Sequence, residues 1–376
     1  MFKKSLAAVA VLGAFAGTAL AADVQLYGLV DYGFHYTETK TTGADKVTNF
    51  DLKSGQNSGS RFGLKGVEDL GNGYKVGFVL ENAFNADDGT LDAEGRLFHR
   101  ESLLFVQSAW GELSFGRTGA LDAGTGRYNL MGTGASAMGT GWGNVGKSNK
   151  VLLGTGDRMD NTVTYKSPAF AGVTVFAQGS FKQDNVDADD AKGLDLIEDD
   201  EEGSSDANRY YALGVTYKAA GLSTGFVASQ TDYKRDWVNA AGGNKANDDA
   251  QAYSAFVNYD FGFVKPMLAV QYFDKGLVTG KKGYGVVVGA TAPVLGGTLK
   301  ATAGWADAEM VDHVAAGKPA TDYKNTMVGV GYEYPLSKRT YLYTAAGYLE
   351  EKTEATGSAD SKKKTTEVMA GLVHKF

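Results

Sequence analysis

The sequence contains no cysteine and only five prolines in 376 residues. The absence of cysteine excludes disulfides and thiolate metal sites, and it fits an exported protein that needs neither. Beyond residue 21 there is also no uninterrupted apolar stretch of about 20 residues, the length that a transmembrane helix requires. These absences exclude a helical membrane protein and a domain held together by disulfides.

Signals of catalysis are also sparse. The four histidines, His35, His99, His313 and His374, are scattered, and neither H-E-x-x-H nor G-x-S-x-G occurs. His99 and Glu101, two residues apart, are the one faint catalytic pair. We therefore predict no enzymatic activity, no cofactor and no metal site. The formal net charge of −7 argues against a nucleic-acid partner.

The first 21 residues predict a secretory signal peptide. Lys3 and Lys4 precede an apolar run that ends in an A-x-A cleavage pattern. A membrane anchor needs about 20 apolar residues, and this run is shorter. Cleavage after Ala21 or Ala22 removes two lysines and no acidic residue, which changes the net charge from −7 to −9.

Glycine and tyrosine are abundant, with 51 and 20 residues, in segments of alternating polarity. Residues 366–376 show the alternation clearly, and Phe376 closes the chain. A soluble domain rarely ends on a large aromatic residue, because chain termini usually fray into water. A strand whose outer face contacts lipid, with an aromatic residue at the membrane boundary, explains this ending.

The alternation recurs along the whole chain and predicts sixteen strands, with Asn72-Gly73 marking a tight hairpin turn. The eight long connections lie near residues 37–58, 86–95, 118–158, 182–208, 234–250, 274–282, 308–322 and 351–363. An even strand number with short turns at one rim and long loops at the other is typical of bacterial outer-membrane barrels.

The predicted fold is therefore all-β: one sixteen-stranded antiparallel transmembrane β-barrel spanning residues 22–376. A barrel of this size is too wide for side chains to fill and encloses an aqueous channel. A soluble β-sandwich is the alternative, but it leaves many outward Tyr, Phe and Leu side chains without an opposing sheet. Two soluble domains are disfavoured because no linker-like change in composition divides the chain.

Several motifs resemble the trimeric general-diffusion porins of the Gram-negative outer membrane, especially the neisserial and β-proteobacterial subgroup. The most specific is S-R-F-G-L-K-G-V-E-D-L-G-N-G at residues 60–73. The other matches are L-Y-G at 26–28, F-G-R at 115–117, D-N-T-V-T-Y-K-S-P at 160–168 and the closing K-F at 375–376.

The resemblance implies a location, partners and a constriction. It implies the cell outer membrane, with lipid and lipopolysaccharide as neighbours, and a homotrimer in which the second loop, residues 86–95, latches over a neighbour. It also implies that Phe376 is part of the signal read by the barrel-assembly machinery. The third loop, residues 118–158, is implied to fold inward and narrow the barrel, with basic wall residues facing acidic loop residues.

Parity places positive charge on the predicted pore wall. In the strand predicted at residues 60–69, Phe62 and Leu64 face outward, so Arg61 and Lys65 face the lumen. An inward arginine costs little, whereas one facing lipid at the membrane centre costs roughly 2–4 kcal/mol. In the strand predicted at residues 97–109, the same rule directs Leu103 and Phe105 outward and Arg100 inward.

Two further arginines flank the third loop. Arg117 opens it and Arg158 closes it, and with Arg61 and Arg100 they match the basic cluster of the resembled family. Strict alternation from Phe115 points Arg117 outward unless Gly116 kinks the strand. The alternative is that these are ordinary charged residues near the barrel rim. At a narrow point, they would set ion selectivity through the local potential.

The third loop has few carboxylates of its own. Asp122 and Asp157 are its acidic residues, against Arg127, Lys147 and Lys150. Glu81 and Asp31 are inward supplements to this thin acidic wall, and the balance leans weakly towards anions. The predicted pore-constriction residues are Arg61, Lys65, Glu81, Arg100, Arg117, Asp122, Arg127, Asp157 and Arg158.

Two patterns in the loops invite other interpretations. Residues 141–148, G-W-G-N-V-G-K-S, match the phosphate-loop pattern, but no strand precedes them and no amphipathic helix follows. We interpret the match as chance in a glycine-rich chain. Residues 184–206 hold eleven acidic residues without calcium-loop spacing, which favours a solvated loop, with divalent bridging to lipopolysaccharide phosphates as the alternative.

The sequence therefore predicts an outer-membrane porin for the passive diffusion of ions and small hydrophilic solutes. The alternative from a different class is a structural or surface-interaction barrel whose lumen is plugged and whose long loops bind a partner. Conductance across a planar bilayer separates the two hypotheses.

Overall fold

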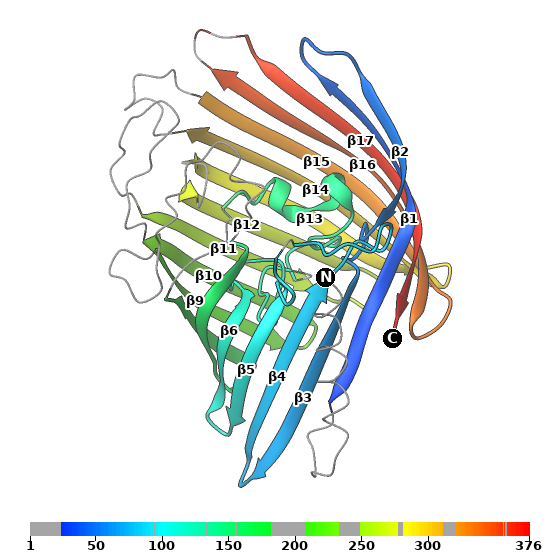
Figure 1. Ribbon diagram of the computed structural model, residues 1–376. Coiled ribbons are helices and arrows are strands. Elements are labelled where there is room, and N and C mark those ends of the chain that lie inside the picture. Colours follow the sequence, from blue (N-terminus) through cyan, green and yellow to red (C-terminus); the bar gives the residue numbers. More distant parts are fainter. Residues whose placement is uncertain are drawn as a thin grey trace.

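A computed structural model describes most of the chain (Figure 1). The described residues are 24–93, 95–132, 134–154, 156–181, 208–232, 249–276, 281–310, 321–355, 357 and 359–376. The predicted signal peptide, residues 1–21, and the acidic loop, residues 184–206, lie outside the described residues.

Strands dominate the described residues. They are β1 (Gln25–Thr41), β2 (Val47–Ser54), β3 (Arg61–Gly71), β4 (Tyr74–Ala83), β5 (Glu101–Ser108), β6 (Gly111–Gly119), β7 (Arg158–Lys166), β8 (Val173–Ser180), β9 (Arg209–Ala219), β10 (Leu222–Asp232), β11 (Ala250–Tyr259), β12 (Lys265–Gly276), β13 (Lys281–Val294), β14 (Gly297–Met310), β15 (Thr321–Pro335), β16 (Thr340–Ala355) and β17 (Ser361–Lys375). Two short helices, α2 (Gly143–Gly146) and η1 (Ser148–Lys150), lie between β6 and β7. In the described part of the chain, neither helix has the length that crossing a membrane requires.

The first and last strands close the sheet into a barrel (Figure 1). β1 pairs antiparallel with β17 from Leu29↔Lys375 to Thr41↔Lys363. On its other edge β1 pairs first with β2 and then with β3, so those two strands share one position in the wall. The seventeen described strands therefore occupy sixteen positions around the barrel wall, and the predicted sixteen-stranded antiparallel barrel is confirmed.

The hairpin predicted at Asn72-Gly73 is also confirmed. β3 ends at Gly71 and β4 begins at Tyr74, and Asn72 has a φ of 51° in this turn. Asparagine and glycine tolerate this left-handed backbone better than other residues. The turn sets the register of β3 against β4, in which Gly63 lies opposite Glu81.

The bounds predicted for the first long connection, residues 37–58, are wrong. β1 continues to Thr41, a short turn follows, and β2 occupies Val47–Ser54. The polar character of this hairpin obscured its strands, yet Phe50 on β2 stacks on Phe34 of β1 with ring centroids 5.8 Å apart. The segment that leaves the wall is shorter and lies later, at residues 55–60.

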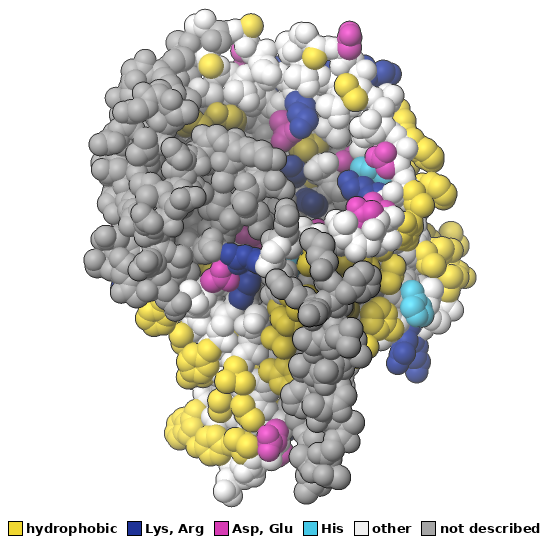
Figure 2. All heavy atoms as spheres, viewed as in Figure 1, with side chains coloured by type: hydrophobic (Ala, Val, Ile, Leu, Met, Phe, Trp, Pro, Cys, Tyr) yellow, Lys and Arg dark blue, Asp and Glu magenta, His cyan; other side chains and the backbone are white. Residues whose placement is uncertain are grey.

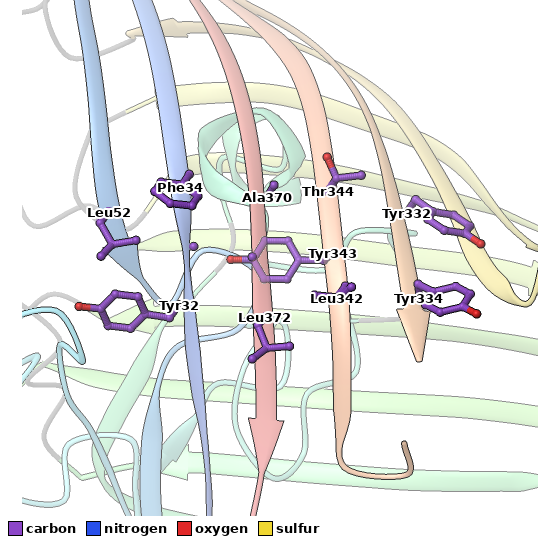
Figure 3. A pocket seen from close by; sticks show the side chains of 12 residues that line it. Tyr32, Phe34, Leu52, Tyr332, Tyr334, Leu342, Tyr343, Thr344, Ala370 and Leu372 are labelled. Atoms are coloured by element: carbon purple, nitrogen blue, oxygen red, sulfur yellow. The ribbon is translucent and has the colours of Figure 1, made fainter. Parts of the chain in front are cut away.

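The outer face of the barrel is apolar. Figure 2 shows hydrophobic side chains along the flanks of the molecule and charged side chains gathered towards the middle of the view. Figure 3 shows part of this face over β1, β2 and β15–β17, where Phe34, Tyr332 and Leu372 project from the wall around a shallow groove. Such a surface is suited to lipid or to another apolar protein surface.

The inner face is covered over much of its area by loop 3, which we define as residues 120–157 between β6 and β7. Leu121, Met131 and Leu152 of loop 3 are at most 2% exposed, and they pack against apolar side chains of the inner wall. Those wall residues include Phe176, Phe256, Val287, Met327 and Leu349. The predicted inward fold of this loop is therefore confirmed by its packing, and α2 contacts β15, β16 and β17 of the inner wall.

Candidate constriction site

Loop 3 is fixed to the inner wall at points around the barrel. Side-chain amides of four different strands bond to its backbone at N···O distances of 2.7–3.0 Å: Gln178 of β8, Asn258 of β11, Gln271 of β12 and Asn325 of β15. Because these strands are distributed around the barrel wall from β8 to β15, the loop is held across the lumen. A loop held in this way narrows the passage and places its own side chains in it.

Wall carboxylates provide a second set of anchors. Glu112 accepts hydrogen bonds from Arg127 Nε at 2.8 Å and from the Tyr128 hydroxyl at 2.6 Å. Glu101 accepts the backbone N–H of Arg127 at 3.0 Å. On β17, Glu367 accepts the backbone N–H and the side-chain amide of Asn144 at 2.8 and 2.7 Å. These acidic groups are engaged in holding the loop.

Asp122, predicted to line the pore, does not present its carboxylate to the lumen. The residue is 1% exposed, and its side chain accepts hydrogen bonds from Ser229 Oγ at 2.7 Å and from the Tyr210 hydroxyl at 3.3 Å. Burial raises the pKa of the Asp122 carboxyl group. Asp122 is therefore a further anchor between loop 3 and the wall. Arg127 likewise extends along the wall to Glu112 and lies over the ring of Phe105.

Arg61, Arg100 and Glu81 form the central charged group. Glu81 Oε1 accepts a hydrogen bond from Arg100 Nε at 2.7 Å, and Arg61 Nε lies 3.5 Å from Glu81 Oε2. Tyr27 donates its hydroxyl hydrogen to the same Oε2 atom at 3.0 Å, and Lys65 Nζ lies 4.9 Å from the centre of the Tyr27 ring. With Lys65 included, the group contains three cationic side chains and one carboxylate, so it carries net positive charge.

Arg158 and Asp157 lie at the end of loop 3. The Arg158 side chain is 14% exposed, and the nearest oxygen of Asp157 is 3.8 Å from its Nη1 atom, whereas Asp157 is 65% exposed. Within the described residues, the buried Nε atom of Arg158 has no hydrogen-bond partner. Asp157 is the one loop 3 carboxylate that reaches open solvent.

Arg117 occupies a different position from the central group. Gly116 has a φ of 123° and the pairing of β6 with β7 shifts register after it, which is the kink that an inward Arg117 would need. The structure pairs Arg117 Nη1 with Asp160 at 2.9 Å, and Asp160 also binds Arg96 at 2.8 Å. Arg117 is therefore part of an ion-pair network at the base of the second loop.

The side-chain directions predicted for the strand at residues 97–109 are wrong. Leu103 and Phe105 are each 3% exposed and face the interior, where Arg127 covers Phe105, while Leu104 is 52% exposed on the outside. The inner wall is apolar here because loop 3 packs on it. Arg100 reaches the lumen nevertheless, since it precedes β5, which begins at Glu101, and so escapes the alternation of that strand.

Asp31 also differs from its predicted role as a supplementary lumen acid. It is completely buried, and its carboxylate accepts hydrogen bonds from residues of the segment 55–60. The faint catalytic pair is not formed: His99 contacts Asp92 at 3.2 Å, and that hydrogen bond lowers the pKa of Asp92, while Glu101 binds loop 3. No sequence signal distinguished these buried carboxylates from lumen-facing ones.

A group of lysines near the tip of loop 3 has no assigned partner. Lys53, Lys147 and Lys150 make no ion pair or side-chain hydrogen bond among the described residues. Burial lowers the pKa of Lys147, and the like charges of Lys150 and Lys53 lower it further. Lys53 and Lys150 line a cavity of about 230 Å³ together with Lys363 and the carboxylates of Asp51, Glu351 and Glu367, so acidic and basic side chains are balanced around it.

The phosphate-loop pattern at residues 141–148 has no supporting structure. α2 is only four residues long, and its N-cap residue Trp142 has a left-handed backbone and a side chain that is 2% exposed. No parallel strand precedes it in the described chain, since β6 and β7 on either side are antiparallel. The segment packs on the wall, with Trp142 edge-on to Tyr343, and does not surround a phosphate.

Comparisons with known proteins agree with the barrel fold. Residues 7–354 match the sequence family described as Gram-negative porin. The chain is 31% identical to an outer membrane porin protein of Bordetella pertussis and 27% identical to outer membrane porin protein 32 of Delftia acidovorans, with both chains covered completely in each case. The solved anion-selective porin from Comamonas acidovorans is 24% identical and has a TM-score of 0.68 over 95% of this chain and all of its own.

Proposed function

Because this chain belongs to the Gram-negative porin family, we propose that the channel it forms favours small anions over cations. The family membership itself confirms the prediction of an outer-membrane porin for the passive diffusion of ions and small hydrophilic solutes. Its relatives are channels and not enzymes. The preference for anions is the finer step, and it rests on charges at the constriction.

One observation carries the proposal: acidic side chains near loop 3 are occupied, while basic ones outnumber their partners. Glu112, Glu101 and Glu367 accept hydrogen bonds from loop 3, and Asp122 is buried. Glu81 alone faces Arg61 and Arg100. Lys147 of loop 3 adds a further cation that forms no ion pair among the described residues. A passing anion therefore meets net positive potential.

The solved porin from Comamonas acidovorans is described as anion-selective, which supports the proposal by analogy. At 24% identity that likeness shows the fold alone, so the charge arrangement of this chain has to be tested directly.

In a planar bilayer with a potassium chloride gradient, the reversal potential of the wild-type channel should have the sign of chloride permeation. The purified full-length mature protein is inserted at low salt, where the Debye length is about 10 Å at 0.1 M, and measured again near 1 M, where it is about 3 Å. Because fixed charges are screened at high salt, the preference should weaken there. A potassium-selective potential at low salt would contradict the proposed anion preference, and the absence of any conductance would favour a plugged barrel.

We propose in addition that the protein is exported with a signal peptide cleaved after Ala21 or Ala22 and assembles as a homotrimer. The apolar outer face supports burial in lipid and against neighbouring subunits, with lipopolysaccharide as a further neighbour. The second loop, residues 86–95, is proposed to latch over an adjacent subunit. These assignments follow from the family, and the barrel-assembly machinery is the partner expected during insertion.

Phe376 connects the end of the chain to its beginning. Its backbone N–H donates to Gly28 O at 3.0 Å, and Gly28 N–H donates to Phe376 O at 3.2 Å. An added Cβ at Gly28 would lie 2.5 Å from the Phe376 ring, so the glycine leaves the space in which the aromatic ring lies. Phe376 thus helps close the barrel, which supports its proposed role in assembly.

Deleting Phe376 should leave export intact and reduce the yield of folded, heat-modifiable trimer in the outer membrane. The deletion removes both the aromatic ring on Gly28 and the last two backbone hydrogen bonds of the closure. Trimer is quantified by unheated and heated gel electrophoresis of outer-membrane fractions. Phe376→Tyr, which keeps the ring, is the matched control and should assemble normally. Wild-type trimer yield from the deletion would contradict the assembly role.

A further inference from the structure

Between β2 and β3 the chain leaves the barrel wall. On β1, the pairing passes from Tyr32↔Ser54 to Leu29↔Arg61, so two residues of β1 face six residues, 55–60. Six residues cannot fit the length of two within an extended ladder, which forces the segment out of the sheet. We call residues 55–60 the inner segment, because its contacts lie with loop 3 and with inward side chains.

Asp31 holds the inner segment in place. Its Oδ2 atom accepts the backbone N–H groups of Asn57 and Ser58, each at 2.7 Å, and its Oδ1 atom accepts the Tyr343 hydroxyl at 2.7 Å. The backbone of Asp31 also accepts Gly55 N–H at 3.1 Å. These donors replace a cationic partner for this buried carboxylate, as a charged acceptor with several good hydrogen bonds requires.

The inner segment contacts both sides of the constriction. Towards loop 3, Gln56 O accepts the backbone N–H of Trp142 at 2.7 Å. Towards the central charged group, Ser58 Oγ and Gly59 O accept hydrogen bonds from Arg61 Nη1 at 3.1 and 3.0 Å. The segment therefore orients Arg61 and supports the tip of loop 3 at the same time.

Side chains of β15 and β16, which follow β17 and β1 in the barrel wall, fix the segment as well. Asn57 donates from Nδ2 to Glu333 at 3.2 Å and accepts the Tyr341 hydroxyl at 2.9 Å. Lys300 in turn binds Glu333 at 2.8 Å and lies over the ring of Trp142. The segment is thus tied to β1, β15, β16 and loop 3, and it cannot move without disturbing all four.

We infer that the inner segment is a second constriction element and that Asp31 is the positioning residue that sets ion selectivity through it. The role assigned to Asp31 rests on the proposed anion preference, because it acts by holding Arg61 where it faces the permeating ion. The position of the segment in the pore does not depend on that preference. Asp31 thus contributes to selectivity although its own charge is buried.

Asp31→Asn gives opposite results under the two roles considered for this residue. If Asp31 supplied negative charge to the lumen, its neutralisation would shift the reversal potential towards anions. If it positions Arg61, the asparagine amide cannot accept all the hydrogen bonds, Arg61 loses its orientation, and the reversal potential shifts towards cations. A shift towards anions, or no shift in assembled channels, would overturn the positioning role.

Tyr343→Phe is the second variant, in case Asp31→Asn fails to assemble. It removes one hydrogen bond to Asp31 and keeps the ring that packs on Trp142. It should produce a smaller shift in the same direction. Tyr332→Phe is the matched control, because Tyr332 lies on the outer face and its hydroxyl binds the backbone of Val294, so its reversal potential should equal that of the wild type.

Cysteine modification tests the inner segment independently of selectivity. The sequence contains no cysteine, so Ser58→Cys provides a single thiol in the segment. A charged methanethiosulfonate reagent added to the open channel should cause a stepwise loss of conductance, even if the wild-type channel has no anion preference. Ser337→Cys, in the exposed turn between β15 and β16, is the control and should react without loss of current. Unchanged conductance after confirmed modification of Ser58→Cys would place the segment outside the ion path.

Discussion

Deleting residues 124–146 is expected to raise the single-channel conductance several-fold and to admit sugars that the intact protein excludes. The deleted part includes Met131 and Trp142, which are buried against the inner wall. It also includes Asn144, whose bonds to Glu367 hold the loop tip across the lumen. Without this part of loop 3, a sixteen-stranded barrel retains a much wider aqueous channel.

The barrel should still assemble, because its backbone ladder closes through β1 and β17 without loop 3. Stability should fall, since the deletion uncovers wall residues such as Phe256 and Met327. Fully burying a side chain of this size stabilises a protein by about 1.5–3 kcal/mol. The variant should therefore unfold at a lower temperature than the wild type and still conduct.

Conductance in planar bilayers and liposome swelling in sugars of increasing size measure the two effects. The control removes the exposed residues Gly43 to Asp45 in the turn between β1 and β2, which lie away from the apolar clusters of loop 3, and should change neither measurement. If conductance and the size limit of the 124–146 deletion both remain at wild-type values, loop 3 does not set the width of the pore.

The strand pattern could be predicted from the sequence because the residues that contact lipid have to be apolar in every strand. Each strand of the wall needs apolar side chains at alternate positions, and turns such as Asn72-Gly73 have strong local signals. The count of sixteen strand positions in the wall follows from those two features. The polar hairpin of β1 and β2 was missed in part, because Thr, Lys and Asp dominate its sequence over residues 37–54.

The inner face follows no comparable rule. Phe105 is as apolar as an outward residue, yet it points inward because loop 3 and Arg127 cover it. Asp31 and Asp122 have the parity and charge expected of pore-lining acids, yet both are buried as hydrogen-bond acceptors. These assignments depend on where a loop docks, which is decided by long-range packing and not by local alternation.

The length of a side chain also affects how closely its position depends on the parity of its strand. Arg61 and Arg100 have long side chains that reach the passage from several backbone positions, so an error in parity matters less. Arg100 reached the lumen although its strand was assigned the wrong direction. A carboxylate on a short side chain depends closely on its backbone position, and Asp122 shows the consequence.

Replacing Arg61 and Arg100 together with serine should reverse the proposed preference and give a cation-selective channel at low salt. The substitutions remove two of the three cations of the central charged group. They also leave the Glu81 carboxylate without either of its arginine partners. At about 5 Å and the dielectric constant of water, one unit charge changes the energy of a passing ion by roughly 0.8 kcal/mol. That energy corresponds to about a fourfold change in local ion concentration, so two charges change the local concentration of one ion by roughly sixteenfold before screening by salt.

Two further variants make this result specific to the central charged group. Glu81→Gln removes the acid and should increase the preference for anions, which is the opposite sign from the arginine substitutions. Arg339→Ser removes a cation in the exposed turn between β15 and β16 and should leave the reversal potential unchanged. All differences should shrink near 1 M salt, where the Debye length is about 3 Å. An unchanged low-salt reversal potential in the double variant would mean that Arg61 and Arg100 lie away from the ion path, and the selectivity would then have to come from the lysines of loop 3.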